Sequence, residues 1–337
     1  MSAAVLATRK SSKRWKALPV SISFDGREPV EAVLAKAQAA VDGGVDAIWL
    51  ACHLFQRDPI VTAGVLLSRH QRLKVTLVAI SPYLVHPVHA AMAAATLDEF
   101  FPGRVSLCLG VGAPGDLADV GVETRAPLGP IREALQICRA LFSGETVQVD
   151  GKRFKVSGRS LASGPHEIPL LLAASGPKML RLAGTHADGV LLSAGASVEF
   201  VRWSLGRVSA DGDRANFLRA GLVYGSVDDD ARTAFDRVRR VLATTLRGKH
   251  HARNLNLAGS PLDQDAVNLA IVSGDGDAAD RLIVDSIVER HAAAGSPDIF
   301  RSRLAAYRAA GLDDTVLASM RTPAQITAIL SALNGVA

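Results

Sequence analysis

Eight short runs rich in apolar and β-branched residues recur along the chain and alternate with stretches of helical spacing. The runs cover residues 19–24, 45–51, 74–80, 104–110, 168–174, 188–193, 218–225 and 314–319. The run at 74–80 is almost continuously apolar or β-branched, which is typical of a strand buried on both faces of a parallel sheet. Strands that alternate with helices form βα units. Eight such units predict an α/β fold, a (β/α)8 TIM barrel with insertions.

The stretch after the first run illustrates the helical spacing. Apolar side chains stand at positions 30, 33, 34, 37 and 41, which lie on one face of an α-helix. Pro29 suits the first turn of such a helix, and Gly43 suits its C-terminal end. The pattern therefore predicts a helix between the first two strands.

Two segments are longer than a minimal barrel needs. Residues 143–158 carry Asp150-Gly151 between two alternating runs, which predicts a β-hairpin. Residues 247–310 hold two or three helical patterns between the seventh and eighth strands, so we expect a helical insertion there. We expect residues 1–16 to be a disordered basic tail and residues 17–337 to form a single TIM-barrel domain.

Charge and cysteine content exclude several classes of protein. The formal net charge is +5, but five basic residues precede the first acid, Asp25, so the remainder from residue 17 is formally neutral and nucleic-acid binding is not expected. Cys52, Cys108 and Cys138 are too few and too far apart for a disulfide framework or a zinc site. The chain shows neither a signal-peptide pattern nor an apolar run of about 18 residues, so we expect a cytoplasmic protein that does not enter membranes.

A glycine-rich segment follows the fourth run. Residues 110–115 match the G-x-G-x-x-G fingerprint of dinucleotide-binding proteins. That fingerprint needs a long helix opening at its last glycine, and Pro114 interrupts this one, so we do not expect a dinucleotide site. Two interpretations remain open for Gly110 and Gly112: a plain turn, or a backbone that lets a flat ring lie against the barrel.

A second candidate follows the fifth run, at Ser175-Gly176-Pro177-Lys178-Met179. Pro177 suits the first position of a helix, which leaves the amides of Lys178 and Met179 free to bind an anion with the help of the helix dipole. The alternative is an ordinary helix start.

Histidines supply the remaining candidate chemistry. His53 closes the second run, so it faces the usual active-site end of a barrel and can donate a proton, although a structural histidine is the alternative. We interpret the neighbouring Cys52 as a packing residue. His86 and His89 lie three residues apart without a third ligand nearby, so we expect no metal site.

Taken together, the segments resemble the bacterial luciferase-like monooxygenase superfamily, and most closely its deazaflavin-dependent branch, which includes methylenetetrahydromethanopterin reductase. The resemblance is carried, in chain order, by Ser23-Phe24-Asp25-Gly26-Arg27-Glu28-Pro29, His53-Leu54-Phe55-Gln56-Arg57-Asp58-Pro59, Ser81-Pro82-Tyr83, His86-Pro87, Thr96-Leu97-Asp98-Glu99, Gly176-Pro177-Lys178-Met179-Leu180 and Ala187-Asp188-Gly189-Val190.

The resemblance implies a TIM barrel that holds coenzyme F-420 (8-hydroxy-5-deazaflavin), or alternatively FMN, at its C-terminal mouth. It implies a small-molecule substrate and a homo-oligomer, a dimer. The cofactor phosphate would lie on residues 175–179, and His53 would lie beside the ring as the catalytic residue. The implied cofactor-binding residues are His53, Val78, Ala79, Ser81, Gly110, Gly112, Ala174, Ser175, Gly176, Pro177, Lys178 and Met179, with a non-prolyl cis peptide near Val78-Ala79.

One residue departs from the pattern of this branch, because Cys52 stands where the branch usually has an aspartate before the histidine. The activity implied first is hydride transfer between coenzyme F-420 and a small organic substrate. Two alternatives stay open: an FMN-dependent monooxygenase that uses reduced flavin and oxygen, and a non-catalytic flavin-binding barrel.

Overall fold

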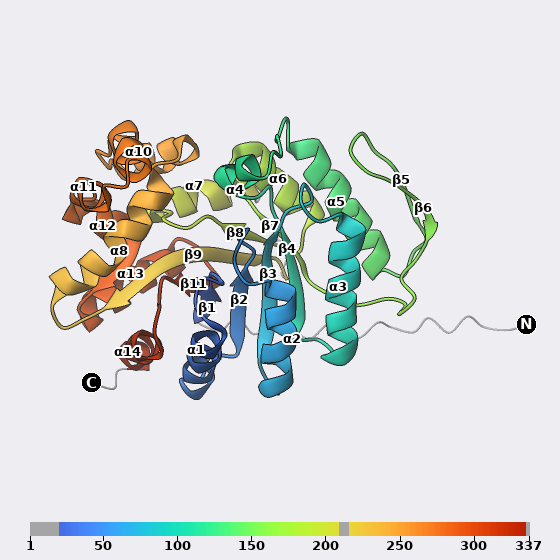
Figure 1. Ribbon diagram of the computed structural model, residues 1–337, viewed down its shortest axis with the longest axis horizontal. Helices are drawn as coiled ribbons and strands as arrows, with labels where there is room; N and C mark the ends of the chain where they lie inside the picture. Colours follow the sequence, from blue (N-terminus) through green and yellow to red (C-terminus); the bar gives the residue numbers. More distant parts are fainter. Residues whose placement is uncertain (1–19, 209–215, 335–337) are drawn as a thin grey trace, which may run out of the picture.

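A closed barrel of eight parallel strands forms the centre of the molecule. The computed structural model describes residues 20–208 and 216–334 (Figure 1). The barrel strands are β1 (Val20–Phe24), β2 (Ala47–Ala51), β3 (Lys74–Ile80), β4 (Val105–Leu109), β7 (Leu170–Ala173), β8 (Gly189–Leu192), β9 (Leu218–Val227) and β11 (Asp314–Ala318). Each strand pairs with the next in this order, β11 pairs with β1, and pairing of β8 with β9 completes the closure. The predicted (β/α)8 TIM barrel is confirmed, and the strands differ from the predicted runs only at their ends.

The two faces of the barrel wall pack into different cores. Inward-facing side chains fill the lumen, including the fully buried Trp49 and Cys108. Outward-facing side chains pack against the surrounding helices and form a larger apolar cluster. Because side chains fill the lumen, the barrel is a solid scaffold for whatever lies on its ends.

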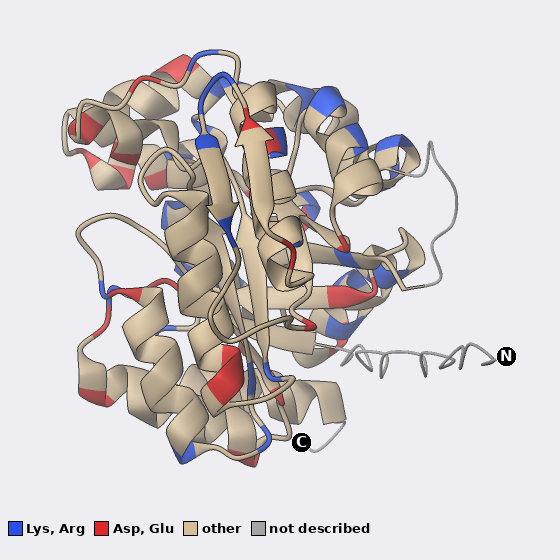
Figure 2. Cartoon of the chain, turned by 90° about the vertical axis from the view of Figure 1, so that its right-hand side faces the viewer, with Lys and Arg blue, Asp and Glu red and all other residues tan. Residues whose placement is uncertain are grey.

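Helices surround the barrel. They are α1 (Val30–Asp42), α2 (Pro59–Arg69), α3 (Pro87–Phe100), α4 (Pro114–Asp119), α5 (Leu128–Phe142), α6 (Pro177–His186), α7 (Val198–Val208), α8 (Ala231–Leu246), α13 (Pro297–Ala309) and α14 (Pro323–Asn334). The predicted first helix is present, with Pro29 and Gly43 as its caps. Acidic and basic residues are interspersed over the outer helices, while the central strands carry few charges (Figure 2).

The predicted hairpin is present as β5 (Val147–Asp150) and β6 (Lys155–Arg159), which pair antiparallel. Its turn is held by one side chain of α5. The carboxylate of Glu133 accepts hydrogen bonds from the backbone N–H groups of Lys152, Arg153 and Phe154, each at 3.0 Å. A Cβ atom at Gly151 would lie 2.4 Å from that carboxylate, so a larger residue there would push the Glu133 side chain away from the turn.

The region 247–310 contains more structure than its helical patterns predict. It comprises a 3₁₀ turn (Lys249–His251), α9 (Ala252–Ala258), α10 (Gln264–Val272), α11 (Gly276–Leu282), α12 (Asp285–His291), strand β10 (Ala292–Gly295) and α13. The expectation of two or three helices was too low, and β10 was not predicted. Its sequence, Ala-Ala-Ala-Gly, has no β-branched residue. It is a strand because it pairs with the part of β9 that extends beyond the barrel, residues 224–227.

Residues 245–292 form an added segment, and both of its ends contact Tyr224 of β9. Ala292, where β10 begins, pairs with Tyr224 in the sheet. On the other side, a hydrogen bond of 2.7 Å joins the Tyr224 hydroxyl to that of Thr245, in the last turn of α8. The residues between these two points pack on α8 and β10, whereas Phe300 and Tyr307 of α13 belong to the main core of the barrel. The predicted tail, residues 1–16, lies outside the described residues.

Candidate functional site

All of the site residues predicted from the sequence lie at one end of four neighbouring strands. In the barrel, β2, β3, β4 and β7 follow one another. The carboxyl end of β2 carries His53, and that of β3 carries residues 78–81. The end of β4 carries Gly110 and Gly112, and the end of β7 carries residues 174–179. Catalytic groups of TIM barrels gather at this end, because the loops that leave the strands meet there. The topology therefore brings the glycine-rich segment at 110–112, the segment at 174–179 and His53 to one face of the barrel.

Small residues make the floor of this face. The peptide bond between Val78 and Ala79 is cis, where the resemblance implied one, and the register of β3 with β4 shifts at this point. A Cβ atom at Gly110 would lie 2.7 Å from the Cβ of Ala79 and 3.3 Å from that of Ala173. Gly110 is therefore required for the close approach of three strands. With Ala79 and Ala173 half-buried above the lumen, the floor offers shallow apolar surface on which a flat ring can lie.

Ser81 fixes the loop next to this floor. Its buried hydroxyl donates to the carbonyl of Val111 at 2.6 Å and accepts from the amide of Tyr83 at 3.3 Å. Gly112 has φ of 100°, a conformation that L side chains rarely adopt. The segment then enters α4, a helix of six residues that begins at Pro114. This confirms that residues 110–115 do not open the long helix of a dinucleotide fingerprint.

His53 has a carboxylate neighbour that the sequence analysis missed. Asp116, in the first turn of α4, places Oδ2 3.8 Å from Nδ1 of His53 and accepts from the amide of Leu54 at 3.4 Å. The side chains of His53 and Asp116 are 40% and 35% exposed, so both are open to a bound molecule. Asp116 follows directly after the glycine-rich motif, and an acid at the carboxyl end of a barrel strand was the signal that could have identified it.

Cys52 is a packing residue in this setting. Burial raises the pKa of its thiol, and the charges of Asp58 and Asp116 raise it further. The thiol therefore stays neutral near pH 7 and is a poor nucleophile. A carboxylate still lies near His53, because Asp116 approaches it from the loop that follows β4.

The second motif forms the start of α6. Gly176 is the N-cap, Pro177 occupies the first turn, and no side chain of the described residues caps the helix by a hydrogen bond. A Cβ atom at Gly176 would find no other atom within 4 Å, so the space in front of the helix is open. Ser175 and Met179 are half-buried and Lys178 is exposed. The amides of this turn and the Ser175 hydroxyl fit an anion such as a phosphate monoester.

His86 has a structural role. Nδ1 of His86 accepts a hydrogen bond from the amide of Val88 at 3.2 Å and so caps α3. In residues 20–208 and 216–334, no group of three or more His, Cys, Asp or Glu side chains is arranged to hold a metal ion. Within the same ranges, no helix is both long and apolar enough to cross a bilayer.

Comparison with known proteins gives the same picture. A 5,10-methylenetetrahydromethanopterin reductase of Archaeoglobus fulgidus is 29% identical over 302 residues, which cover 83% of this chain and 87% of the relative. An F420-dependent glucose-6-phosphate dehydrogenase of Nocardia farcinica is 27% identical over 268 residues, 74% of each protein.

Solved structures share the fold. The coenzyme F420-dependent tetrahydromethanopterin reductase of Methanopyrus kandleri has a TM-score of 0.83 at 22% identity, over 93% of this chain and 96% of that chain. An F420-dependent secondary alcohol dehydrogenase has a TM-score of 0.76 at 20% identity, over 94% of this chain and 99% of that chain. The sequence model of the luciferase-like monooxygenase family matches residues 11–314. That match spans most of the protein, so the chain belongs to the luciferase-like monooxygenase family.

Proposed function

We propose that this protein is an oxidoreductase that transfers a hydride between coenzyme F-420 and a small organic substrate. The observation that carries the proposal is the pairing of an open, uncapped start of α6 with a floor of small residues on the adjacent strands. Relatives with reductase and F420-dependent dehydrogenase names support coenzyme F-420 over other flavins. When bound, the deazaflavin ring accepts or donates the hydride, and the protein supplies binding, orientation and charge.

Each part of the site has a role in this proposal. Residues 174–179 hold the phosphate through the amides of Lys178 and Met179 and the hydroxyl of Ser175. Ala79 and Gly110 face the ring, and Ser81 with Gly112 keeps the adjoining loop in place. His53 lies beside the ring and exchanges a proton as charge redistributes there. Asp116, whose Oδ2 lies 3.8 Å from Nδ1 of His53, orients the imidazole.

FMN is the second candidate cofactor. Monooxygenase structures share the fold at lower similarity, among them the oxygenating component of 3,6-diketocamphane monooxygenase in complex with FMN, which has a TM-score of 0.66. Both cofactors carry a phosphate and a flat tricyclic ring, so the start of α6 and the floor suit either one. An enzyme with FMN would use oxygen and act as a monooxygenase, and a binding protein without turnover is the remaining alternative.

The decisive experiment compares cofactor affinity in two glycine variants. Gly176→Asp places a carboxylate where the phosphate binds, and aspartate is a good N-cap, so the helix itself stays stable. Gly129→Asp adds the same charge in the first turn of α5, where a Cβ atom also has free space, and serves as the control. Coenzyme F-420 and FMN are titrated separately by fluorescence.

We expect the parent protein and the control to bind coenzyme F-420 more tightly than FMN, and Gly176→Asp to lose binding. Equal binding by both variants would refute the phosphate site. Preference for FMN with oxygen-dependent turnover would favour the monooxygenase, and tight binding without turnover of any substrate would favour the binding protein.

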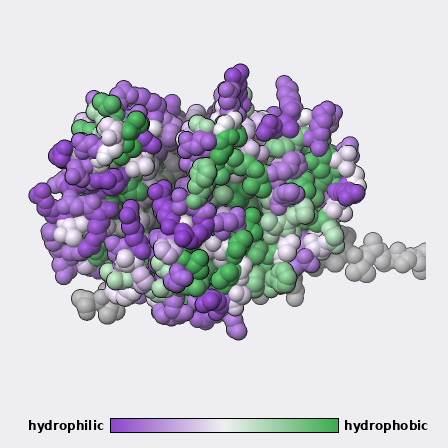
Figure 3. All heavy atoms as spheres, viewed as in Figure 1, coloured by the Kyte–Doolittle hydropathy of each residue, from purple (hydrophilic) through white to green (hydrophobic). Residues whose placement is uncertain are grey.

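We also propose that the protein forms a homodimer through α2 and α3. Apolar side chains gather over these two helices on the face seen in Figure 3. Val61 of α2 is 69% exposed, and Met92 and Phe100 of α3 are 47% and 73% exposed. A second copy of the chain that covers them would bury apolar surface. The cytoplasmic location expected from the sequence stays a prediction.

A further inference from the structure

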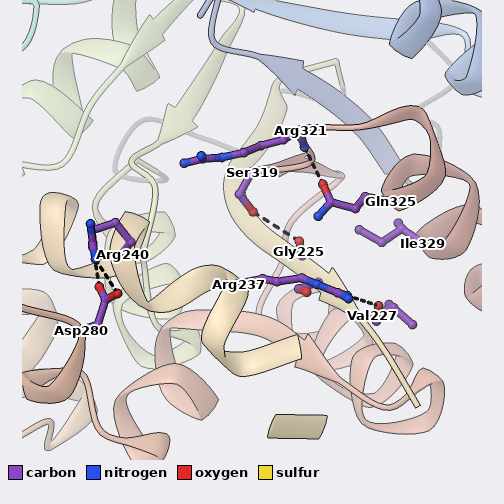
Figure 4. Close-up of a pocket in the computed structure, with 10 residues that line it drawn as sticks. Gly225, Val227, Arg237, Arg240, Asp280, Ser319, Arg321, Gln325 and Ile329 are labelled. Carbon is purple, nitrogen blue, oxygen red and sulfur yellow. Dashed lines mark hydrogen bonds and ion pairs between the residues drawn. The ribbon is translucent and has the colours of Figure 1, made fainter. Parts of the chain in front are cut away.

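A cavity of about 360 Å³ lies away from the four strands of the candidate site. It opens where β9 and β11 end, between α8, α11 and the start of α14 (Figure 4). Its backbone wall includes Gly225 of β9 and Ser319, which follows β11. The hydroxyl of Ser319 donates to the carbonyl of Gly225 at 3.3 Å and so ties the two strand ends together.

Three arginines reach this cavity, and two of them are already held. Arg240 of α8 forms a two-pronged ion pair with Asp280 of α11, with contacts of 2.7 and 2.9 Å. Arg237 of α8 donates to the carbonyl of Val227 at 3.1 Å and to the carboxylate of Asp228 at 2.6 Å. These contacts fix both guanidinium groups in the wall and leave further N–H groups of each for another partner.

Arg321 is the third arginine, and its guanidinium has no hydrogen-bond or ion-pair partner in the part of the chain that the structure describes. Its backbone amide donates to the side-chain oxygen of Gln325 at 2.7 Å, which fixes the start of the side chain. Figure 4 shows the guanidinium extended over the cavity toward the side where Arg240 lies. Asp228 balances the charge of Arg237, and Asp280, with Asp277 at 3.5 Å, balances that of Arg240. Within the described residues, Arg321 is therefore the arginine of this wall that no carboxylate contacts.

The start of α14 does not provide the binding groups. Thr322 accepts from the amide of Gln325 at 3.3 Å, and Gln325 accepts from the amides of Arg321 and Thr322, so side chains of the helix itself satisfy this turn. The positive character of the cavity comes from the arginine side chains. A guanidinium matches a phosphate or carboxylate with two parallel hydrogen bonds.

The position of the cavity separates it from the proposed phosphate site of the cofactor. Around the barrel, β11 is two strands from β2 and His53 in one direction, while β7 and residues 174–179 are three strands away in the other. A ring beside His53 with its phosphate at α6 therefore extends away from Arg321. A group at Arg321 approaches the same barrel end from the opposite side.

We propose that this cavity binds an oxyanion, a phosphate or carboxylate group carried by the substrate, with Arg321 as its principal contact. The assignment to the substrate rests on the proposed function, but the binding of an oxyanion does not. The enzyme would then act on anionic substrates and hold their charged group apart from the reacting carbon.

Calorimetric titration with inorganic pyrophosphate tests the site at constant ionic strength. The parent protein should bind two equivalents, one at α6 and one at Arg321. Gly176→Asp should remove the first only, and Arg321→Gln should weaken the second about tenfold in Kd, as expected for losing a hydrogen bond between charged groups. Arg321→Lys should restore part of that loss. Arg232→Gln removes an exposed arginine of α8 outside the cavity and should change neither equivalent.

The proposal would be overturned if the parent protein bound only one equivalent of pyrophosphate and Arg321→Gln bound that equivalent with unchanged affinity. The source of the anion is decided by cofactor titration of the same variant. Unchanged affinity for coenzyme F-420, together with a raised KM for phosphorylated or carboxylated substrates, supports a substrate group, whereas a tenfold loss of cofactor affinity would assign the cavity to the cofactor and refute the substrate role. If no flavin binds the parent protein but the Arg321-dependent equivalent remains, the proposed function fails and the oxyanion site stands.

Discussion

At the scale of single residues, the position of His53 predicts that it acts in the hydride-transfer step more than in cofactor binding. The phosphate end of the cofactor supplies much of the binding energy, whereas a proton donor beside the ring matters chiefly when charge redistributes. We expect His53→Ala to lower the rate of hydride transfer about a hundredfold, with a much smaller change in cofactor affinity. Single-turnover reduction and fluorescence titration on one preparation measure both quantities.

His89→Ala is the matched control for that variant, because His89 is exposed on α3. Asp116→Asn should lower the rate less than His53→Ala, since it removes the charge beside the imidazole but leaves the imidazole in place. Loss of affinity alone in His53→Ala would make His53 a binding residue without a role in proton transfer.

Asp314 gives the fold a pH dependence of its own. Burial raises the pKa of its carboxyl to about 6, although the hydroxyl of Ser21 donates to it at 2.7 Å and opposes the shift. Since the folded-state pKa lies above the unfolded value, the protonated form favours folding, and this stability is lost as the pH rises through 6. Relative to Asp314→Asn, the parent protein should lose at most about 3 kcal/mol between pH 4 and 7.

Urea unfolding of the two proteins across this range provides the measurement. Taking the difference between them cancels groups that titrate in both, such as His291, whose pKa burial lowers to about 4. A difference that does not vary with pH would mean that Asp314 is ionised throughout the range.

At the scale of elements, the β5–β6 hairpin depends on one carboxylate. Burial raises the pKa of Glu133, but hydrogen bonds from Phe154, Arg153 and Lys152 lower it more, so the net shift is downward and the charged form holds the turn. Glu133→Ala leaves three N–H groups without their acceptor, and we expect a loss of about 1–2 kcal/mol in local stability. Hydrogen exchange of these amides should accelerate while exchange in the barrel strands stays unchanged.

The same contact predicts a direction with pH. Because the folded-state pKa of Glu133 is lowered, its contribution is present above the usual glutamate range and is lost as the pH falls. Protection of the turn that stays constant on acidification would show that packing, and not the carboxylate, holds it. One such packing contact is the edge-to-face pair of Phe154 with His86, with ring centroids 5.2 Å apart.

The elements also show what can be read from the sequence and what cannot. The barrel strands and the hairpin follow from local patterns, because burial on two faces and the Asp150-Gly151 turn each leave a local signal. Strand β10 leaves none, since its alanines are extended only through pairing with the overhang of β9. Position after a strand could place both His53 and Asp116 at the same end of the barrel. It could not show that they are neighbours, because their proximity depends on how the loops of β2 and β4 meet.

At the scale of the whole molecule, the proposed dimer predicts which surface substitutions matter. Val61→Asp puts a charge into the apolar face of α2 and α3 and should convert the dimer to a monomer. Val272→Asp is the control, because Val272 is similarly exposed, at 73% against 69% for Val61, but lies on α10. Size-exclusion chromatography with light scattering gives the mass of each. A monomeric parent protein, or dissociation by Val272→Asp alone, would place the interface elsewhere or remove it.

The meeting of both ends of the added segment at Tyr224 has an evolutionary consequence. Thr245 and Ala292 contact the same residue of β9, so the chain leaves the barrel and returns to it at one point. A segment with adjacent ends can lengthen, shorten or be exchanged between homologues without moving the strands that carry His53 and the start of α6. Asp280, one wall of the arginine-lined cavity, lies within this segment. Exchange of the segment is thus a route by which an unchanged reaction can be applied to new substrates. The two ends of the segment are suitable junctions for building chimaeric enzymes.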